Sequence, residues 1–154
     1  MSDQIRDRIN AALKQATKSQ EKLRMSTLRL INAAIKDRDI AARTAGKREG
    51  VSDAEVLDIL AKMIKQRRES VETYEGAGRL ELAEREQGEI EVIADFLPRQ
   101  LDEAAMEKAC TEVVAEIGAD GLKDMGRTMA VLKERYAGQM DFGKASGVVK
   151  RLLS

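Results

Sequence analysis

Residues 52–98, SDAEVLDILAKMIKQRRESVETYEGAGRLELAEREQGEIEVIADFLP, hold the clearest fold signals in the chain. Ser52 and Glu55 match a capping box, in which each side chain accepts a hydrogen bond from the other residue's backbone N–H. Apolar residues then recur at the spacing of one helix face. The sequence therefore predicts a helix over residues 53–75.

The connection after this helix fixes how the next helix packs on it. Two glycines in GAG, residues 76–78, break the apolar pattern, which resumes in a second predicted helix over 79–96. When the pair is folded about Ala77 as an antiparallel hairpin, the two apolar faces meet and Arg67 comes level with Glu86. Because a buried charge without a partner is costly, we predict an Arg67–Glu86 ion pair that fixes the register, with Gln87 as a second possible partner. The alternative is a polar pocket.

The composition of the whole chain fits helices packed on helices. Of its 154 residues 43% are hydrophobic and 35% charged, whereas aromatics make up 3% and there is one proline. This mixture is typical of an all-α protein. No apolar run approaches the roughly 20 residues that cross a bilayer, and the polar first residues lack the apolar segment of a signal peptide. We therefore expect a cytoplasmic protein with no membrane partner.

Two further helices precede the hairpin. The first is predicted over residues 3–18, with Ser2 as its N-cap, and the second over residues 21–43. The polar, glycine-containing stretch TAGKREG, residues 44–50, follows as a mobile loop. The first of these helices has a narrow apolar stripe, so it must pack on a partner. The four helices are predicted to form one four-helix bundle.

The only proline marks the best domain boundary. A residue before proline resists the helical conformation, so the fourth helix is predicted to end near Leu97, just before Pro98. We therefore predict an N-terminal domain over residues 1–97 and a C-terminal domain over residues 98–154.

The C-terminal domain is predicted to be a smaller three-helix bundle. Asp102, Asp124 and Asp141 stand where N-caps are expected, and Gly118 and Gly138 stand where the first two of these helices should end. Apolar residues recur at helical spacing within each segment. A domain of this size is near the lower limit for independent folding, so it is expected to lean on the first bundle or on a partner.

One basic stretch, KLRMSTLRLINAAIK, begins at Lys22 and carries four positive charges and no negative one. On a helix, Lys22, Arg29, Lys36 and Arg43 recur every seven residues and drift only about 20° per step, so they form one stripe. Arg24 falls on the core side, where we expect a carboxylate partner. The stripe is about 30 Å long and suits the phosphates of an RNA backbone. The alternative is a solvated basic face, which the zero net charge and scarce aromatics favour.

Three segments of the chain resemble the YqeY-like family: TLRLINAAIKDRDI, IKQRRESVETYEGAGRLELAEREQGEIEVIADFLPRQL and DMGRTMAVLKERYAG. Chains of this family are similar to the C-terminal tail domain of the B subunit of the tRNA-dependent amidotransferase, and the match covers nearly the whole sequence. The resemblance implies a helical bundle followed by a smaller three-helix bundle. It supplies no reaction for a free-standing member.

The resemblance also implies a partner. In the amidotransferase the related tail contacts tRNA, while catalysis occurs on other domains and another subunit. If this carries over, Lys123, Arg127, Lys133 and Lys144, around the DMG segment, are the residues expected to touch RNA. Arg127 stands where the family often has Lys, which keeps the positive charge.

The chain offers few groups for catalysis. It has no His, its one Cys, Cys110, falls on a core stripe, and it contains no GxSxG element. AGKREG lacks the first Gly of a phosphate loop and has Arg48 where Ser or Thr would bind magnesium. We therefore expect no catalytic residue, no metal site and no cofactor.

Three hypotheses of function follow. The first is a non-catalytic, tRNA-associated accessory protein, whose expected partners are tRNA and an aminoacyl-tRNA or amidotransferase-related protein, but not DNA. The alternative is a protein-interaction or scaffolding module in which the C-terminal bundle docks on an enzyme. The third, a carbon–nitrogen ligase with glutamine as amido donor, rests on family analogy alone.

Overall fold

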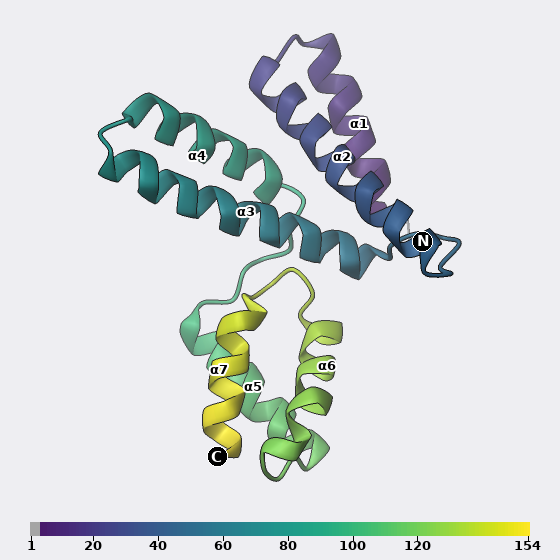
Figure 1. Ribbon diagram of the computed structural model, residues 1–154, viewed down its shortest axis with the longest axis vertical. Coiled ribbons are helices and arrows are strands. Elements are labelled where there is room, and N and C mark those ends of the chain that lie inside the picture. The colour runs from purple at the N-terminus through teal and green to yellow at the C-terminus, as the bar shows by residue number, and fades with distance from the viewer. Residues whose placement is uncertain (1–3) are drawn as a thin grey trace. The chain divides into compact units, whose positions relative to one another are not determined.

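The computed structural model describes residues 4–154, and this part of the chain consists of helices with no strand (Figure 1). The predicted all-α class is therefore confirmed, while the expected Ser2 cap lies outside the described residues. The elements are α1 (Gln4–Lys18), α2 (Lys22–Thr44), α3 (Asp53–Gly76), α4 (Leu80–Ala94), α5 (Glu103–Ile117), the 3₁₀ turn η1 (Leu122–Asp124), α6 (Met125–Arg135) and α7 (Phe142–Leu153).

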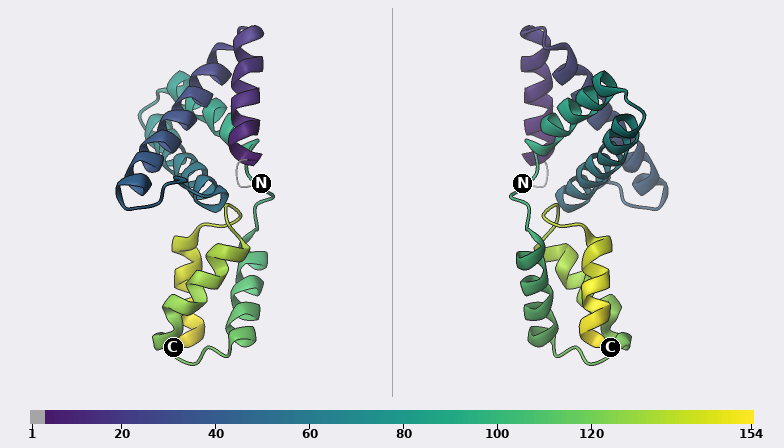
Figure 2. Two further views of the ribbon diagram at one scale, coloured as in Figure 1. Left: turned by 90° about the vertical axis from the view of Figure 1, so that its right-hand side faces the viewer. Right: turned by 90° about the vertical axis from the view of Figure 1, so that its left-hand side faces the viewer.

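The chain forms two compact units, the first ending at Leu97 and the second beginning at Pro98. In the first unit α1 packs on α2 and α3 on α4, so that each pair is a helical hairpin, and the hairpins meet mainly where α2 contacts α4 (Figures 1 and 2). Their apolar faces share one core. Its fully buried members include Ile9, Leu28, Ile31, Val56, Leu60 and Ile93.

The start of α3 shows how local sequence fixes a helix end. The backbone N–H of Glu55 donates to the Ser52 hydroxyl (3.2 Å), and the N–H of Ser52 donates to a Glu55 carboxylate oxygen (3.1 Å), so the predicted capping box is present. Lys47 Nζ also donates to the Glu55 carboxylate (2.5 Å). This hydrogen bond, with that from Ser52, lowers the pKa of Glu55.

The connection between α3 and α4 differs from the prediction by one residue. Helix α3 continues through Gly76, and α4 begins at Leu80, so the turn is centred on Gly78 instead of Ala77. Gly78 has a φ of +72°, a left-handed conformation that glycine adopts without strain. Because a hairpin pairs residues about its centre, this shift moves every partner on α4 by two positions.

Two glycines let backbone and side chain approach closely. Gly50, just before α3, has a φ of +79°, and a Cβ there would lie 2.3 Å from Asp39 Oδ1. Gly88 lies where α4 meets the start of α2, and a Cβ there would lie 2.7 Å from Leu23 Cδ2. Position 50 therefore requires glycine beside a buried carboxylate, whereas a side chain at position 88 would require only that the end of Leu23 move.

The second unit has its own core between α5, α6 and α7 (Figure 2). Asp102 accepts a hydrogen bond from the N–H of Ala105 (2.7 Å), and Asp141 accepts one from the N–H of Gly143 (2.8 Å), so both act as N-caps as predicted. Gly118 ends α5 in a left-handed conformation (φ +66°). The buried side chains include Cys110, Val113, Leu132, Ala145 and Val149.

Helix α6 begins directly after Asp124, as predicted, but the predicted side-chain cap and the predicted end were wrong. Asp124 was expected to cap this helix, but its φ of −95° and ψ of 6° lie outside the extended region that an N-cap needs. Its carboxylate instead accepts a hydrogen bond from the N–H of Asp120 (2.8 Å), because η1 runs directly into α6. The helix also ends at Arg135, before the expected Gly138.

Candidate functional site

The basic stripe, defined as Lys22, Arg29, Lys36 and Arg43, runs along the outer side of α2. All four side chains are exposed. In the described part of the chain, no ion pair involves Lys22, Arg29 or Lys36, and Arg43 Nε donates to the backbone oxygen of Arg48 (3.2 Å). Lys22, Arg29 and Lys36 thus present cations to solvent without an ion-paired carboxylate, whereas Arg43 lies near enough to Asp39 to help lower the pKa of that carboxyl.

Apolar side chains lie beside the basic stripe on the same helix. Leu30 is 46% exposed and Ile40 is 52% exposed. At 3.6 residues per turn Ile40 falls on the same side of α2 as Lys22, and Leu30 falls between the stripe and the core-facing side. The core-facing side buries Leu28, Ile31 and Ile35. Helix α2 therefore shows a buried apolar face and an exposed face that is basic with two exposed aliphatic side chains.

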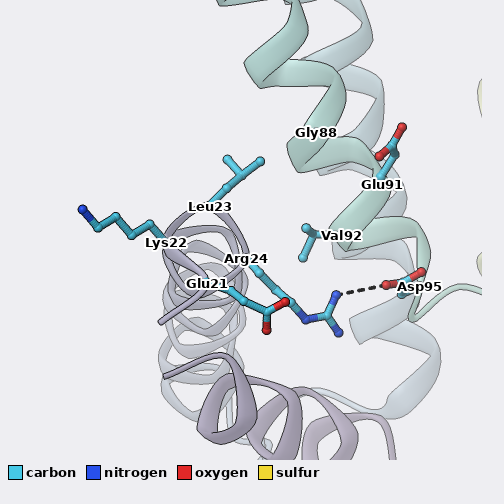
Figure 3. Close-up of a pocket in the computed structure, with 8 residues that line it drawn as sticks. All are labelled: Glu21, Lys22, Leu23, Arg24, Gly88, Glu91, Val92 and Asp95. Carbon is cyan, nitrogen blue, oxygen red and sulfur yellow. Dashed lines mark hydrogen bonds and ion pairs between the residues drawn. The ribbon is translucent and has the colours of Figure 1, made fainter. Parts of the chain in front are cut away.

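A shallow hollow of about 550 Å³ lies where the start of α2 crosses α4 (Figure 3). Arg24 reaches across it to Asp95 (Nη1 to Oδ2, 3.2 Å), which confirms the expected carboxylate partner. Leu23 points toward Gly88, whereas Lys22 extends away from α4 (Figure 3). The lining mixes both signs of charge, so the hollow has no strong preference for an anion or a cation.

The four C-terminal candidates do not form one cluster. Lys123, Arg127, Lys133 and Lys144 are all exposed. Arg127 pairs with Asp124 (3.3 Å) and donates to the carbonyl oxygen at the end of α5, so this side chain ties η1 and α6 to α5. Lys133 and Lys144 lie toward the connection from α6 to α7, at the other end of α6 from Lys123 and Arg127. The structure thus separates these residues into two pairs.

Arg67 has a carboxylate partner, but it is Glu89 and not the predicted Glu86. Arg67 Nη2 lies 3.9 Å from Glu89 Oε1, and both side chains are largely buried. The hairpin is centred one residue later than expected, which places Glu89 opposite Arg67. Glu86 lies against Glu89, and burial together with this second carboxylate raises the pKa of Glu89 despite Arg67.

Sequence reasoning missed a second buried arginine–carboxylate pair. Arg6 on α1 donates two hydrogen bonds to Asp39 on α2, at 2.8 and 2.7 Å. The Arg6 guanidinium holds the pKa of Asp39 at about 2, well below its ordinary 3.8. The signal was present, because Asp39 continues the Ile31 and Ile35 face of α2, just as Arg67 interrupts an apolar face of α3.

The one thiol is unsuited to nucleophilic chemistry. Cys110 is fully buried in the second core, and burial raises the pKa of its thiol. A buried thiol with a raised pKa carries little thiolate, which is the reactive form. Among residues 4–154, no group of three or more His, Cys, Asp or Glu side chains could hold a metal ion.

Comparison with known families decides where the chain belongs. The family model described as "Yqey-like protein" matches residues 6–153, which is nearly the whole sequence. The chain belongs to the YqeY-like family. The match includes α2 with its basic stripe, both hairpins and the C-terminal unit.

Two similar proteins carry the name "Altered inheritance of mitochondria protein 41, mitochondrial". That of Lachancea thermotolerans is 35% identical over 85 residues, which are 55% of this chain and 43% of that protein. That of Pyrenophora tritici-repentis is 30% identical over 135 residues, which are 83% of this chain and 71% of that protein. The first alignment thus spans less than half of the fungal protein. No helix in the described part of our YqeY-like chain is long and apolar enough to span a bilayer.

Proposed function

We propose that this YqeY-like protein is a non-catalytic accessory protein that binds tRNA through the basic stripe on α2. The observation that carries the proposal is the stripe itself, because Lys22, Arg29 and Lys36 are exposed and lack carboxylate partners among the described residues. The line of cations, about 30 Å long, suits contacts with several phosphates along an RNA backbone. The resemblance to the amidotransferase tail supports tRNA as the nucleic acid.

The proposal assigns different tasks to the two domains. The first unit supports the basic stripe, and the second unit offers a second, weaker contact with tRNA. Lys123, Lys133 and Lys144 are exposed, while Arg127 is already bound to Asp124. We propose that the protein acts on the cytoplasmic tRNA pool together with an aminoacyl-tRNA or amidotransferase-related protein.

The experiment is a titration of labelled tRNA with the full-length protein at several salt concentrations. Four phosphate contacts predict that the affinity falls on the order of 50- to 150-fold between about 50 and 200 mM salt. The variant Lys22→Glu/Arg29→Glu/Lys36→Glu is expected to bind at least about tenfold more weakly at low salt, because three attractive contacts become repulsive.

A matched control separates the stripe from overall charge. The variant Lys62→Glu/Lys65→Glu/Arg68→Glu changes the net charge equally at three exposed positions on α3. Lys62 there already pairs with Asp58 (3.1 Å). The control should keep most of the affinity. Equal losses in both variants, or no tRNA binding by the unaltered protein at low salt, would contradict the proposal.

A scaffolding role is the second candidate, and exposed leucines of the C-terminal unit favour it. Leu122 is 51% exposed and Leu152 is 37% exposed. Large apolar side chains on a surface often mark contacts with another protein. Crosslinking in cells, followed by identification of the attached RNA and proteins, distinguishes the candidates. Recovery of one protein without tRNA, lost on Leu122→Glu/Leu152→Glu, would favour scaffolding.

A further inference from the structure

The zero net charge of the chain conceals a strong separation of charge. Residues 1–50 contain twelve Lys and Arg against six Asp and Glu, whereas residues 51–97 contain six against twelve. The C-terminal residues 98–154 contain nine of each sign. The α1–α2 hairpin is therefore basic, the α3–α4 hairpin is acidic by the same amount, and the second unit is balanced.

The acidic charge gathers at the turn end of the α3–α4 hairpin. This end projects beyond the α1–α2 hairpin (Figure 1), and between residues 65 and 88 only Ala83 is buried. Over residues 69–91 there are eight glutamates and two arginines. We call the exposed glutamates nearest the turn the acidic end: Glu69, Glu72, Glu75, Glu81 and Glu84. Glu91 is not part of it, because it lies farther along α4 and lines the hollow that Lys22 also lines.

The acidic end and the basic stripe do not neutralise each other within one copy. The stripe lies on the side of α2 opposite Ile31 and Ile35, and these core residues face the rest of the first unit. Helix α2 meets α4 through Leu23 and Gly88, well back from the turn between α3 and α4. The two charged surfaces therefore remain open to contacts outside the molecule.

We propose that two copies of this chain associate, with the acidic end of each lying on the basic stripe of the other. A reciprocal arrangement forms two equal contacts about one twofold axis and closes, so the product is a dimer and not a filament. Exposed aliphatic side chains accompany both surfaces, since Leu80 at the acidic end is 65% exposed and Ile40 beside the stripe is 52% exposed. Charges around such side chains resemble the rim of a protein interface.

The contact has a defined dependence on salt and on RNA. Ion pairs between exposed side chains are individually weak and screened by salt, so the dimer should form at low ionic strength and dissociate as salt rises. A nucleic acid that occupies the stripe would displace the acidic end. The acidic end is then a reversible cover that keeps the stripe from other anionic partners.

Two charge-reversed variants of the full chain test the contact. The stripe-reversed variant is Lys22→Glu/Arg29→Glu/Lys36→Glu, and the end-reversed variant is Glu72→Lys/Glu75→Lys/Glu84→Lys. The measurement is the weight-average mass by sedimentation at low salt over a range of concentrations. We expect the unaltered protein to approach twice the monomer mass as concentration rises, and each variant alone to stay at the monomer mass.

An equimolar mixture of the two variants gives the decisive test of the proposed contact. An acidic stripe then meets a basic end, and a basic stripe meets an acidic end, so the equimolar mixture should regain the dimer. Recovery also shows that both variants are folded. A mixture that stays monomeric, an end-reversed variant that still dimerises, or an unaltered protein at monomer mass at every concentration overturns the proposal.

The outcome is separable from tRNA binding. The end-reversed variant keeps the basic stripe, so it should bind tRNA at least as tightly as the unaltered protein. A chain that combines all six reversals should still dimerise, because its acidic stripe then meets the basic end of its partner. Dimerisation is measured without RNA, and therefore either proposal can fail while the other stands.

Discussion

Two arginine–carboxylate pairs in the first unit are buried to similar degrees, but the pKa of the carboxyl group is lowered in one pair and raised in the other. The side chains of Arg6 and Asp39 are 21% and 9% exposed, and those of Arg67 and Glu89 are 15% and 11% exposed. Yet the pKa of Asp39 is lowered to about 2, whereas that of Glu89 is raised. Burial alone therefore does not decide whether such a pair stabilises the fold.

The difference lies in how completely the polar atoms are satisfied. Arg6 binds both oxygens of Asp39 and also donates to the Val51 carbonyl (2.9 Å), while the Val51 N–H donates to Asp39 (2.9 Å). Arg67 is 3.9 Å from Glu89, donates to the Met63 carbonyl (3.2 Å), and its Nε is buried without a hydrogen-bond partner among the described residues. A fully bonded pair offsets its desolvation, and a partly bonded one does not.

The largest effect is expected from breaking the fully bonded pair. Asp39→Asn keeps the shape but removes the charge that balances Arg6, and leaving a buried charge without its partner costs about 3 kcal/mol. Urea unfolding measures this loss. Asp37→Asn, an exposed change on the same helix, is the control and should leave the unfolding free energy unchanged within about 0.5 kcal/mol.

The pH dependence of Asp39 gives the next largest effect. Its pKa is about 2 in the folded protein against 3.8 ordinarily, so its charged form stabilises the fold above about pH 4 and this contribution is lost as pH falls through about 2. The shift corresponds to about 2 kcal/mol. The unfolding free energies of the unaltered protein and Asp39→Asn should converge over this window. A constant difference down to pH 2 would argue against the assignment.

A smaller effect on the unfolding free energy, with the opposite dependence on pH, is expected for Glu89→Gln. Because burial raises the pKa of Glu89, its charged form is disfavoured in the folded protein. The neutral replacement should therefore match the unaltered protein within about 1 kcal/mol at pH 7, or be more stable. As pH falls from 7 toward 4.5, protonation of Glu89 stabilises the fold, so the unaltered protein should gain on the variant. Glu91→Gln, at an exposed neighbour, controls for the change of residue type.

The smallest effect is expected at an exposed pair with good geometry. Arg135 and Glu116 join α6 to α5 through two hydrogen bonds of 2.5 and 2.6 Å, and their side chains are 43% and 54% exposed. Solvent screens such a pair, so Arg135→Ala should leave the urea midpoint unchanged within error. A clear fall in the urea midpoint would show that bidentate geometry matters more than burial. It would then contradict the conclusion drawn from the two buried pairs.

The sequence predicts helices better than it predicts which side chains meet. The capping box at Ser52 and the caps at Asp102 and Asp141 were confirmed, because these signals are local and act within one turn. The partner of Arg67 depends on where a hairpin is centred, and moving the centre from Ala77 to Gly78 moved the position opposite Arg67 from Gln87 to Glu89. An error of one residue in a helix end is therefore negligible for assigning helices, but it changes which side chains pair between two helices.

For the candidate site too, the sequence predicts which residues share one side of a helix better than it predicts which side chains contact each other. The spacing of seven placed Lys22, Arg29, Lys36 and Arg43 on one exposed side of α2, and periodicity alone sufficed for that. Sequence could not show that Arg127 would bind Asp124 and the end of α5, since this contact depends on the path of the loop before α6. RNA binding by either set stays a prediction.

The contact of Leu23 with Gly88 has a practical consequence for control of this molecule. A methyl group added at position 88 would collide with the end of a flexible leucine and not with backbone. The contact can be rebuilt with two substitutions. Gly88→Ala adds a methyl group on α4, and Leu23→Ala removes the side-chain atoms that this methyl group would meet. The first substitution would weaken the packing between the two hairpins, and the second would restore it. The strength of this contact can therefore be changed by design.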